Sequence, residues 1–193
     1  MGYFEQRDVL GAVDFLQSGS LPYPELGRPQ TIFGWGVSMG AATLLLAAAR
    51  EPAIQAVVSD SAYADLMSML RMSLLYHVQI SPVFALGIVQ TTRAIYGIDL
   101  STIRPVDVVK KLAPRPVFFI QGDNDHTVPP AQMNMLAQAA RSAPGAHVQT
   151  WMLTGGVEHA QSFLKMGDVY INHIVDFYTA VLGANVDVAS SRS

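Results

Sequence analysis

The sequence predicts an α/β fold, in which a mostly parallel sheet of about four strands is flanked by helices. Short apolar runs that suit buried strands alternate along the chain with longer segments that have the periodicity of helices. Half of the 193 residues are hydrophobic, so the chain is long enough for one domain with a sizeable core. We expect a single domain over residues 1–183, with a cap-like helical segment at about 66–100 and a disordered tail over 184–193.

Each expected strand is a short apolar run bounded by polar or turn-forming residues. The four are TIFGW (31–35), IQAVVS (54–59), PVFFIQ (116–121) and HVQTWML (147–153). Helices are expected over 4–17, 40–50, 64–98 with a break at Ser81-Pro82, 106–113 and 131–141, and in a closing segment with the apolar stripe Phe163, Met166, Tyr170, Ile174, Phe177 and Val181. Ligands of parallel sheets bind at the carboxyl ends of the strands, so we look for chemistry in the loops that follow them.

The composition excludes several classes of protein. Only 14% of the residues are charged and the formal net charge is −3, so no nucleic-acid partner is expected. The chain has no cysteine, and hence no disulfide, no thiolate metal site and no cysteine nucleophile, which suits a reducing compartment. The first residues, MGYFEQRDVLG, match neither a signal peptide nor a myristoylation motif, so a cytoplasmic protein is expected as written.

One segment has nearly the length of a membrane span. Residues 72–92 carry no formal charge over 21 positions, and a bilayer requires roughly 20. His77, Gln79, Pro82 and Gly87 interrupt this run, which favours a buried or lid-forming pair of helices over a span. Membrane association remains the alternative if an N-terminal segment is missing.

Ser38 lies between the first expected strand and the helix after it, in the run GWGVSMG. In the pattern G-x-S-x-G the serine sits on a sharp turn, and we expect Gly36 and Gly40 to remove side chains that would collide across it. The amide of Met39 would lie in the first turn of the helix, where it can stabilise an oxyanion. The alternative is a tight turn of small residues without chemistry. The position between a buried strand and a buried helix favours a nucleophile.

A serine nucleophile needs a base, and the chain offers five histidines. His159 stands in a loop just after the last expected strand. His77 lies in the apolar middle segment, and His126 directly follows a candidate carboxylate. His147 begins an expected strand, and His173 lies inside the last expected helix. We therefore expect His159 to be the base, with an exposed loop histidine as the alternative.

The base must itself be oriented by a carboxylate, for which there are three candidates. Asp123 and Asp125 follow the third expected strand, and Asp60 follows the second. The alternative for each is a solvated turn residue or a helix cap. The chain order nucleophile, acid, base is associated with the G-x-S-x-G turn, and Ser38, Asp125 and His159 follow it.

Several ordered motifs resemble the α/β-hydrolases, in particular the serine aminopeptidase-like, prolyl oligopeptidase-like and dienelactone hydrolase-like serine hydrolases. GYFEQRDVLGAVDFL resembles the helix before the nucleophile strand, GWGVSMGAATLLLAA the nucleophile elbow, and VVSDSAYADL the strand and loop that follow. KLAPRPVFFIQGDNDHTVP resembles the acid-bearing strand and loop, and GGVEHAQSF the histidine loop. The family pattern G-x-x-D-x-x-V-P implies Asp125 as the acid and leaves Asp123 as a loop residue. Gln121 stands where relatives often have histidine, a difference of little mechanistic weight.

The resemblance also implies parts of the fold that are not in this sequence. Family members carry several strands before the helix that begins here, and one of their early loops supplies the second oxyanion-hole amide. The chain resembles the C-terminal part of such an enzyme. Because the TIFGW strand is central in the family, we expect one of its edges to be open and apolar, so that the chain can self-associate through it.

These residues predict a serine hydrolase that acts on an ester, thioester or amide without a cofactor or metal. Ser38 would attack the acyl carbon, His159 would move the proton, Asp125 would orient the imidazole, and the amide of Met39 would form half of the oxyanion hole. The segment from about Met67 to Ile98 would cover the pocket and favour an apolar acyl or peptide-like substrate, with ordinary helix packing as the alternative. The alternative function is an impaired or inactive fragment that lacks the oxyanion loop and pairs with another chain.

Overall fold

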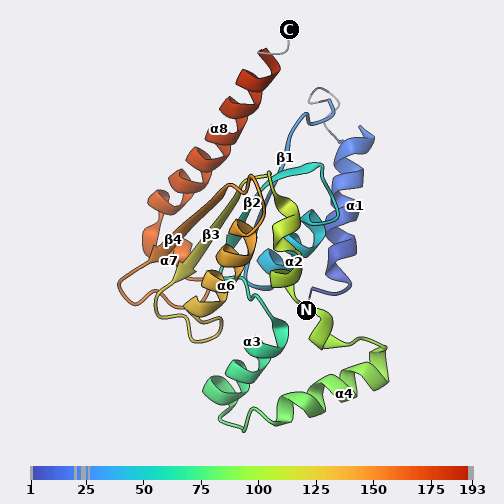
Figure 1. Ribbon diagram of the computed structural model, residues 1–193, viewed down its shortest axis with the longest axis vertical. Coiled ribbons are helices and arrows are strands. Elements are labelled where there is room, and N and C mark those ends of the chain that lie inside the picture. The colour runs from blue at the N-terminus through green and yellow to red at the C-terminus, as the bar shows by residue number, and fades with distance from the viewer. Residues whose placement is uncertain (1, 20, 23–24, 26, 191–193) are drawn as a thin grey trace.

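The computed structural model describes residues 2–19, 21–22, 25 and 27–190, and for 185–190 it describes the backbone alone. Four strands form one sheet in the order β1-β2-β3-β4 (Figure 1). They are β1 Ile32–Val37, β2 Ile54–Asp60, β3 Val117–Gly122 and β4 Val148–Leu153. The predicted fold class, a mostly parallel sheet of about four strands between helices, is confirmed.

All three strand pairings are parallel, so the four strands end at the same edge of the sheet. Val37 at the end of β1 pairs with Asp60 at the end of β2, and Gly122 at the end of β3 pairs with Leu153 at the end of β4. The loops that follow the strands therefore meet, and we call this region the carboxyl edge.

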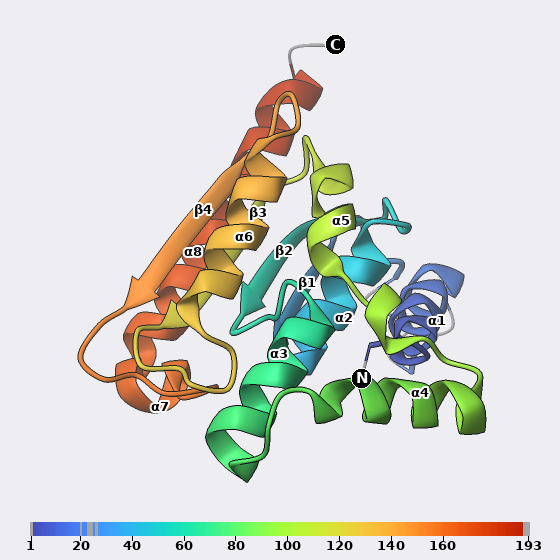
Figure 2. The same ribbon diagram turned by 60° about the horizontal axis from the view of Figure 1, so that its bottom comes forward.

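Two hydrophobic cores lie on the two faces of the sheet. On one face, Val57, Val117 and Phe119 pack against helices that also cover this face in Figures 1 and 2. These helices are α1 Glu5–Ser18, α2 Met39–Ala48, α5 Pro105–Val108 with the 3₁₀ turn η4 Val109–Leu112, and α6 Pro130–Arg141. Helix α2 is buried along nearly its whole length, as its apolar sequence predicts.

The other face is covered by the last helix, α8 Asp168–Ser190. Its buried stripe follows the helical spacing of 3 and 4 residues, and consists of Tyr170, Ile174, Phe177 and Val181. Phe163 was expected in this stripe, but it is half exposed in the separate short helix α7 Ser162–Met166. The two helices are divided at Gly167, whose φ of 53° lies in the left-handed region. Helix α8 continues beyond residue 183, where the patternless tail was expected to begin, and residues 191–193 lie outside the described residues.

The cap-like segment folds as predicted into two helices with a break at Ser81-Pro82. It consists of α3 Leu66–Ser73, the π-helical turn η2 Leu74–Val78 and α4 Phe84–Tyr96, followed by the 3₁₀ turn η3 Leu100–Thr102. Figures 1 and 2 show α3 and α4 projecting beyond the carboxyl edge. Asp65 caps α3 by accepting the amide hydrogen of Ser68 at 2.7 Å.

Among the residues that the structure describes, no helix combines the length and the apolar character that a membrane span requires.

Strand β1 is the last strand on its side of the sheet, so its outer edge has no partner strand among the described residues. Trp35 and Val37 on this strand are 49% and 38% exposed. The open, apolar edge that the sequence predicts is thus present in this part of the chain. Pairing of another chain with it stays a prediction.

Candidate active site

Ser38 occupies a sharp turn between β1 and α2. Its φ of 54° and ψ of −122° are unusual for a residue other than glycine, and such strain costs roughly 1–3 kcal/mol. The turn is held by the Ser38 amide, which donates to the carbonyl oxygen of Asp60 at 2.8 Å, and by the Ser38 carbonyl, which accepts from the Ala42 amide at 3.1 Å. A strained serine between a strand and a helix is the arrangement of a nucleophile elbow.

The two glycines of the elbow differ in their steric surroundings. A Cβ at Gly36 would lie 2.7 Å from the backbone nitrogen of Ala41, so this position has no room for a side chain. A Cβ at Gly40 would meet no described atom within 4 Å beyond its chain neighbours and the backbone of its own helix, because this residue faces open space in the first turn of α2. The expectation that both glycines relieve crowding therefore holds for Gly36 and is wrong for Gly40.

Three of the predicted site residues form one chain of hydrogen bonds at the carboxyl edge. The Oγ of Ser38 lies 2.7 Å from Nε2 of His159, and Nδ1 of His159 lies 2.7 Å from Oδ2 of Asp125. Since a carboxylate only accepts, Nδ1 carries the proton and Nε2 accepts from the Ser38 hydroxyl. His159 comes from the loop between β4 and α7, and Asp125 from the loop between β3 and α6.

The Asp125 carboxylate is buried and fully engaged. Its Oδ1 accepts the backbone amides of Thr127 at 2.9 Å and Val128 at 2.7 Å. Its Oδ2 accepts a hydrogen bond from Nε2 of Gln121 at 2.8 Å and another from Nδ1 of His159. Gln121 is thus a direct hydrogen-bond partner of the carboxylate, although the sequence predicts no role for it. The only feature of the sequence that points to it is a polar residue at the end of an otherwise apolar strand.

Asp123 holds the loop that carries His159, which we call the histidine loop (154–161). Its carboxylate accepts the backbone amides of Gly155 at 3.0 Å, Gly156 at 3.0 Å and Val157 at 2.8 Å. These hydrogen bonds, that of Val157 most of all, lower the pKa of Asp123. Asp123 therefore lies beside the site and fixes the backbone of the loop.

Asp60, the third candidate acid, makes no hydrogen bond to His159 in the part of the chain that the structure describes. It is 1% exposed at the end of β2, and its side chain accepts hydroxyl groups of Ser61, Ser162 and Tyr170. Burial raises the pKa of this carboxyl group, and the three hydroxyl donors oppose the rise.

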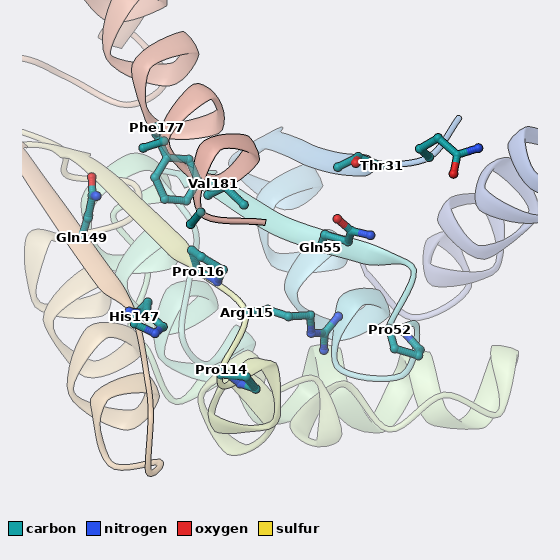
Figure 3. Close-up of a pocket in the computed structure, with 13 residues that line it drawn as sticks. Thr31, Pro52, Gln55, Pro114, Arg115, Pro116, His147, Gln149, Phe177 and Val181 are labelled. Atoms are coloured by element: carbon teal, nitrogen blue, oxygen red, sulfur yellow. The ribbon is translucent and has the colours of Figure 1, made fainter. Parts of the chain in front are cut away.

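The other four histidines do not hydrogen-bond to Ser38 in the described structure. His77 contacts the Thr127 hydroxyl at 2.9 Å, and the His126 ring lies 5.7 Å from that of Tyr76. His173 stacks on Trp151 with ring centroids 4.1 Å apart. His147 lies at the opposite end of the sheet, in the cavity of Figure 3.

The amide of Met39, the predicted oxyanion donor, adjoins Ser38 in the first turn of α2. It has no hydrogen-bond partner among the described residues. An unpaired amide at this end of a helix, where the helix dipole is positive, is available to an anionic oxygen.

Two small cavities adjoin the pair Ser38 and His159, and Thr127 lines both of them. One has a volume of about 130 Å³ and is mainly apolar, with the lining Ser38, Met39, Tyr63, Leu66, Met69, Thr127 and Val128. The other has a volume of about 220 Å³ and is polar, with the lining His77, Asn124, His126, Thr127, Glu158 and His159. Within the described residues, no three acidic or histidine side chains are grouped as metal ligands.

A larger cavity of about 800 Å³ lies at the opposite end of the sheet, between the starts of the strands and the C-terminal half of α8 (Figure 3). Arg115 lines this cavity, and its guanidinium group donates hydrogen bonds to the carbonyl oxygens of Ala48, Glu51 and Ile54 at 2.8–3.0 Å. These bonds join the end of α2 to the start of β2. The predicted site residues Ser38, Asp125 and His159 lie at the carboxyl edge and do not line this cavity.

The sheet order, the helices on both faces and the strained turn after β1 define the class as the α/β-hydrolase fold. The chain belongs to the prolyl oligopeptidase family, whose family model matches residues 1–185. A comparison with curated proteins gives no match.

Solved structures with the same fold include hydrolases of several kinds. An esterase of Pyrococcus furiosus superposes with a TM-score of 0.67 at 19% identity, over 93% of this chain and 62% of its own. The acylaminoacyl peptidase of Pyrococcus horikoshii gives 0.64 at 14% identity, over 94% and 28%. A 2,6-dihydroxy-pseudo-oxynicotine hydrolase gives 0.64 at 21% identity, over 95% and 48%. The chain thus spans less than two thirds of the length of each of these enzymes.

Proposed function

We propose that the protein is a serine hydrolase that cleaves an ester, thioester or amide through an acyl-enzyme. The observation that carries the proposal is the hydrogen-bonded chain Ser38–His159–Asp125, with both distances at 2.7 Å, built on a strained serine. Membership of the prolyl oligopeptidase family supports it. The geometry satisfies the general requirement for a nucleophile beside a base that a third group orients.

In the proposed mechanism, Oγ of Ser38 attacks the acyl carbon while Nε2 of His159 takes the hydroxyl proton. Asp125 stabilises the imidazolium that forms and keeps the ring in the useful tautomer. The carbonyl oxygen, now negative, accepts a hydrogen bond from the amide of Met39. When the tetrahedral intermediate collapses, the bond to the leaving group breaks and the Nε2 proton passes to the leaving atom. Water then repeats the sequence on the acyl-enzyme and releases the acid.

The two cavities suggest how a substrate would lie. The acyl group belongs beside Ser38 and Met39, in the apolar cavity with Tyr63, Leu66 and Met69. The leaving group belongs beside His159, in the polar cavity, because His159 must deliver a proton to it. The volume of about 130 Å³ favours short acyl chains over long ones.

A second candidate function is a catalytically impaired member of the family. The elbow itself supplies one oxyanion donor in the described part of the chain, the amide of Met39. Enzymes with this elbow use a second amide from an earlier loop, and loss of one donor typically costs about 100- to 1000-fold in rate.

Labelling of the purified protein with a fluorophosphonate probe distinguishes the two functions. We expect labelling of the wild-type protein at Ser38, none in Ser38→Ala, and full labelling in the surface control Ser142→Ala. A folded, monodisperse wild-type sample that remains unlabelled contradicts the hydrolase and supports the impaired protein. Hydrolysis rates for p-nitrophenyl esters of increasing acyl length then test the apolar cavity, where short chains should be preferred.

A further inference from the structure

We propose that Asp60 is a positioning residue for the active site: its buried carboxylate and its backbone carbonyl tie the histidine loop to the nucleophile elbow. The inference rests on the proposed hydrolase function. The mechanism above makes no use of Asp60, whose side chain forms no hydrogen bond to Ser38 or His159 in the described structure.

The environment of Asp60 is unusual for a carboxylate. The residue is 1% exposed, and none of the ion pairs in the described part of the chain includes it. Its Oδ1 accepts hydroxyl groups of Ser61 at 2.8 Å and Ser162 at 3.0 Å, and its Oδ2 accepts the hydroxyl of Tyr170 at 2.7 Å. Three hydroxyl donors thus satisfy the buried carboxyl group where an ion pair is missing from the described residues.

The hydrogen bonds of Asp60 connect the segments that carry the nucleophile and the base. Its backbone oxygen accepts the Ser38 amide at 2.8 Å, and so it holds the elbow. Its side chain binds Ser162, the first residue of α7 and three positions after His159. Tyr170 of α8 also accepts Nε1 of Trp35 at 3.2 Å, so the network extends to β1. One residue thus fixes the distance between the two loops whose side chains must meet.

Asp123 and Asp60 hold the histidine loop at its two ends. Asp123 binds the amides of residues 155–157 at the start of the loop. Asp60 binds Ser162 just after its end. Between these two attachments, His159 has little freedom to move away from Ser38, and a misplacement of about 1 Å can cost on the order of 100-fold in rate.

The experiment compares four variants by the rate of fluorophosphonate labelling at neutral pH, by melting temperature and by amide hydrogen exchange over residues 154–162. Asp60→Asn removes the charge at constant size. Ser162→Ala removes the attachment to the loop and keeps the charge, and Tyr170→Phe removes a donor on the other oxygen. Asp14→Asn, an exposed carboxylate on α1, is the charge-matched control.

We expect Asp60→Asn to label about 10- to 100-fold more slowly than wild type at neutral pH. Ser162→Ala and Tyr170→Phe should also label more slowly, and Asp14→Asn should match wild type. A merely structural role for Asp60 would lower the melting temperature without faster amide hydrogen exchange over residues 154–162 in the folded protein.

A folded Asp60→Asn variant with the wild-type labelling rate and wild-type exchange over residues 154–162 overturns the inference. If that variant does not fold, a wild-type rate in both Ser162→Ala and Tyr170→Phe overturns it. If the wild-type protein itself is not labelled, the proposed function fails separately. Amide hydrogen exchange over residues 154–162 then decides, because Ser162→Ala should exchange faster there than Asp14→Asn, and equal rates would refute the attachment.

Discussion

The carboxyl edge and the cap-like segment Leu66–Tyr96 lie next to each other and are built in opposite ways. At the edge, Asp60, Asp123 and Asp125 each accept several hydrogen bonds. In the cap, ten large apolar side chains are exposed: Leu75, Tyr76, Val78, Ile80, Val83, Phe84, Leu86, Ile88, Ile95 and Tyr96. The edge is fixed by many directional bonds, while the cap is held by few. We expect substitutions at the edge to be severe and those on the outer face of the cap to be mild.

The largest effect is expected for Gly122→Ala at the end of β3. The new Cβ would overlap the carbonyl oxygen of Val157 and lie 2.9 Å from its carbonyl carbon, so the histidine loop must shift. We expect a loss of about 1–3 kcal/mol in the free energy of unfolding and roughly 100-fold slower labelling. Chemical denaturation and the labelling rate measure the two effects.

The matched substitution in the cap is Gly87→Ala. A Cβ there meets no described atom within 4 Å beyond its chain neighbours and the backbone of α4. Alanine is also the better helix former by about 0.5–1 kcal/mol. The cap variant should be as stable as wild type or more so. Equal losses in both variants would remove the contrast between the two regions.

Gln121→Leu should rank second. The change leaves Asp125 without one of its donors and also removes the hydrogen bond from Nε2 to the carbonyl of Val128 at 3.0 Å. We expect a loss of about 1–3 kcal/mol in unfolding free energy and about tenfold slower labelling. The control is Gln132→Leu, another buried glutamine, which binds the amides of Ala64 and Asp65 at the base of the cap. It should lose similar stability but label at the wild-type rate; slow labelling in both would count against a role for Gln121.

Asp123→Asn should have a smaller, pH-dependent effect. Hydrogen bonds from the histidine loop lower the pKa of Asp123 below its ordinary value of 3.8, so its contribution to stability is present above that value and is lost as pH falls through the lowered pKa. We expect wild type to melt above Asp123→Asn at neutral pH and the gap to close in acid below pH 3.8. Melting curves across this range test it, and a gap that does not change with pH would contradict the proposed attachment.

The smallest effect is expected for Ile95→Ser on the outer face of α4. This side chain is 65% exposed, so the change in unfolding free energy should stay within about 0.5 kcal/mol. Val89→Ala, on the buried side of the same helix, should cost more, because it leaves a cavity. If both variants lose the same stability, the outer face of the cap is covered in solution by something that the structure does not contain.

Much of the carboxyl edge could be predicted from the sequence because its main residues follow strands. The alternation of apolar runs and helical segments predicts a parallel sheet, and the loops after the first, third and fourth strands contain Ser38, Asp125 and His159. The order of the strands in the sheet is known from the structure alone. The break between the cap helices follows from Ser81-Pro82, since proline cannot continue a helix in that position.

The supporting residues could not be predicted in the same way. Ser162 and Tyr170 donate hydrogen bonds to the carboxylate of Asp60, which lies 102 and 110 positions earlier in the chain. No local sequence pattern indicates a contact over such a separation. In the sequence, Gln121 is one polar residue at the end of a strand. Its hydrogen bond to Asp125 is visible only when the strand and the following loop are placed in three dimensions. The crowding predicted at Gly40 was wrong for the same reason, because a sequence motif does not show which side of a turn faces open space.

The hydrogen bond between Trp35 and Tyr170 gives the molecule an optical reporter. Of the two tryptophans in the sequence, Trp151 is stacked on His173, whereas Trp35 is half exposed on the open edge and bonded to the network of Asp60. A strand laid against β1 would exclude water from the Trp35 indole and shift its emission to shorter wavelength. Fluorescence of the unmodified protein can therefore follow events at the sheet edge and at the active site through the same chromophore.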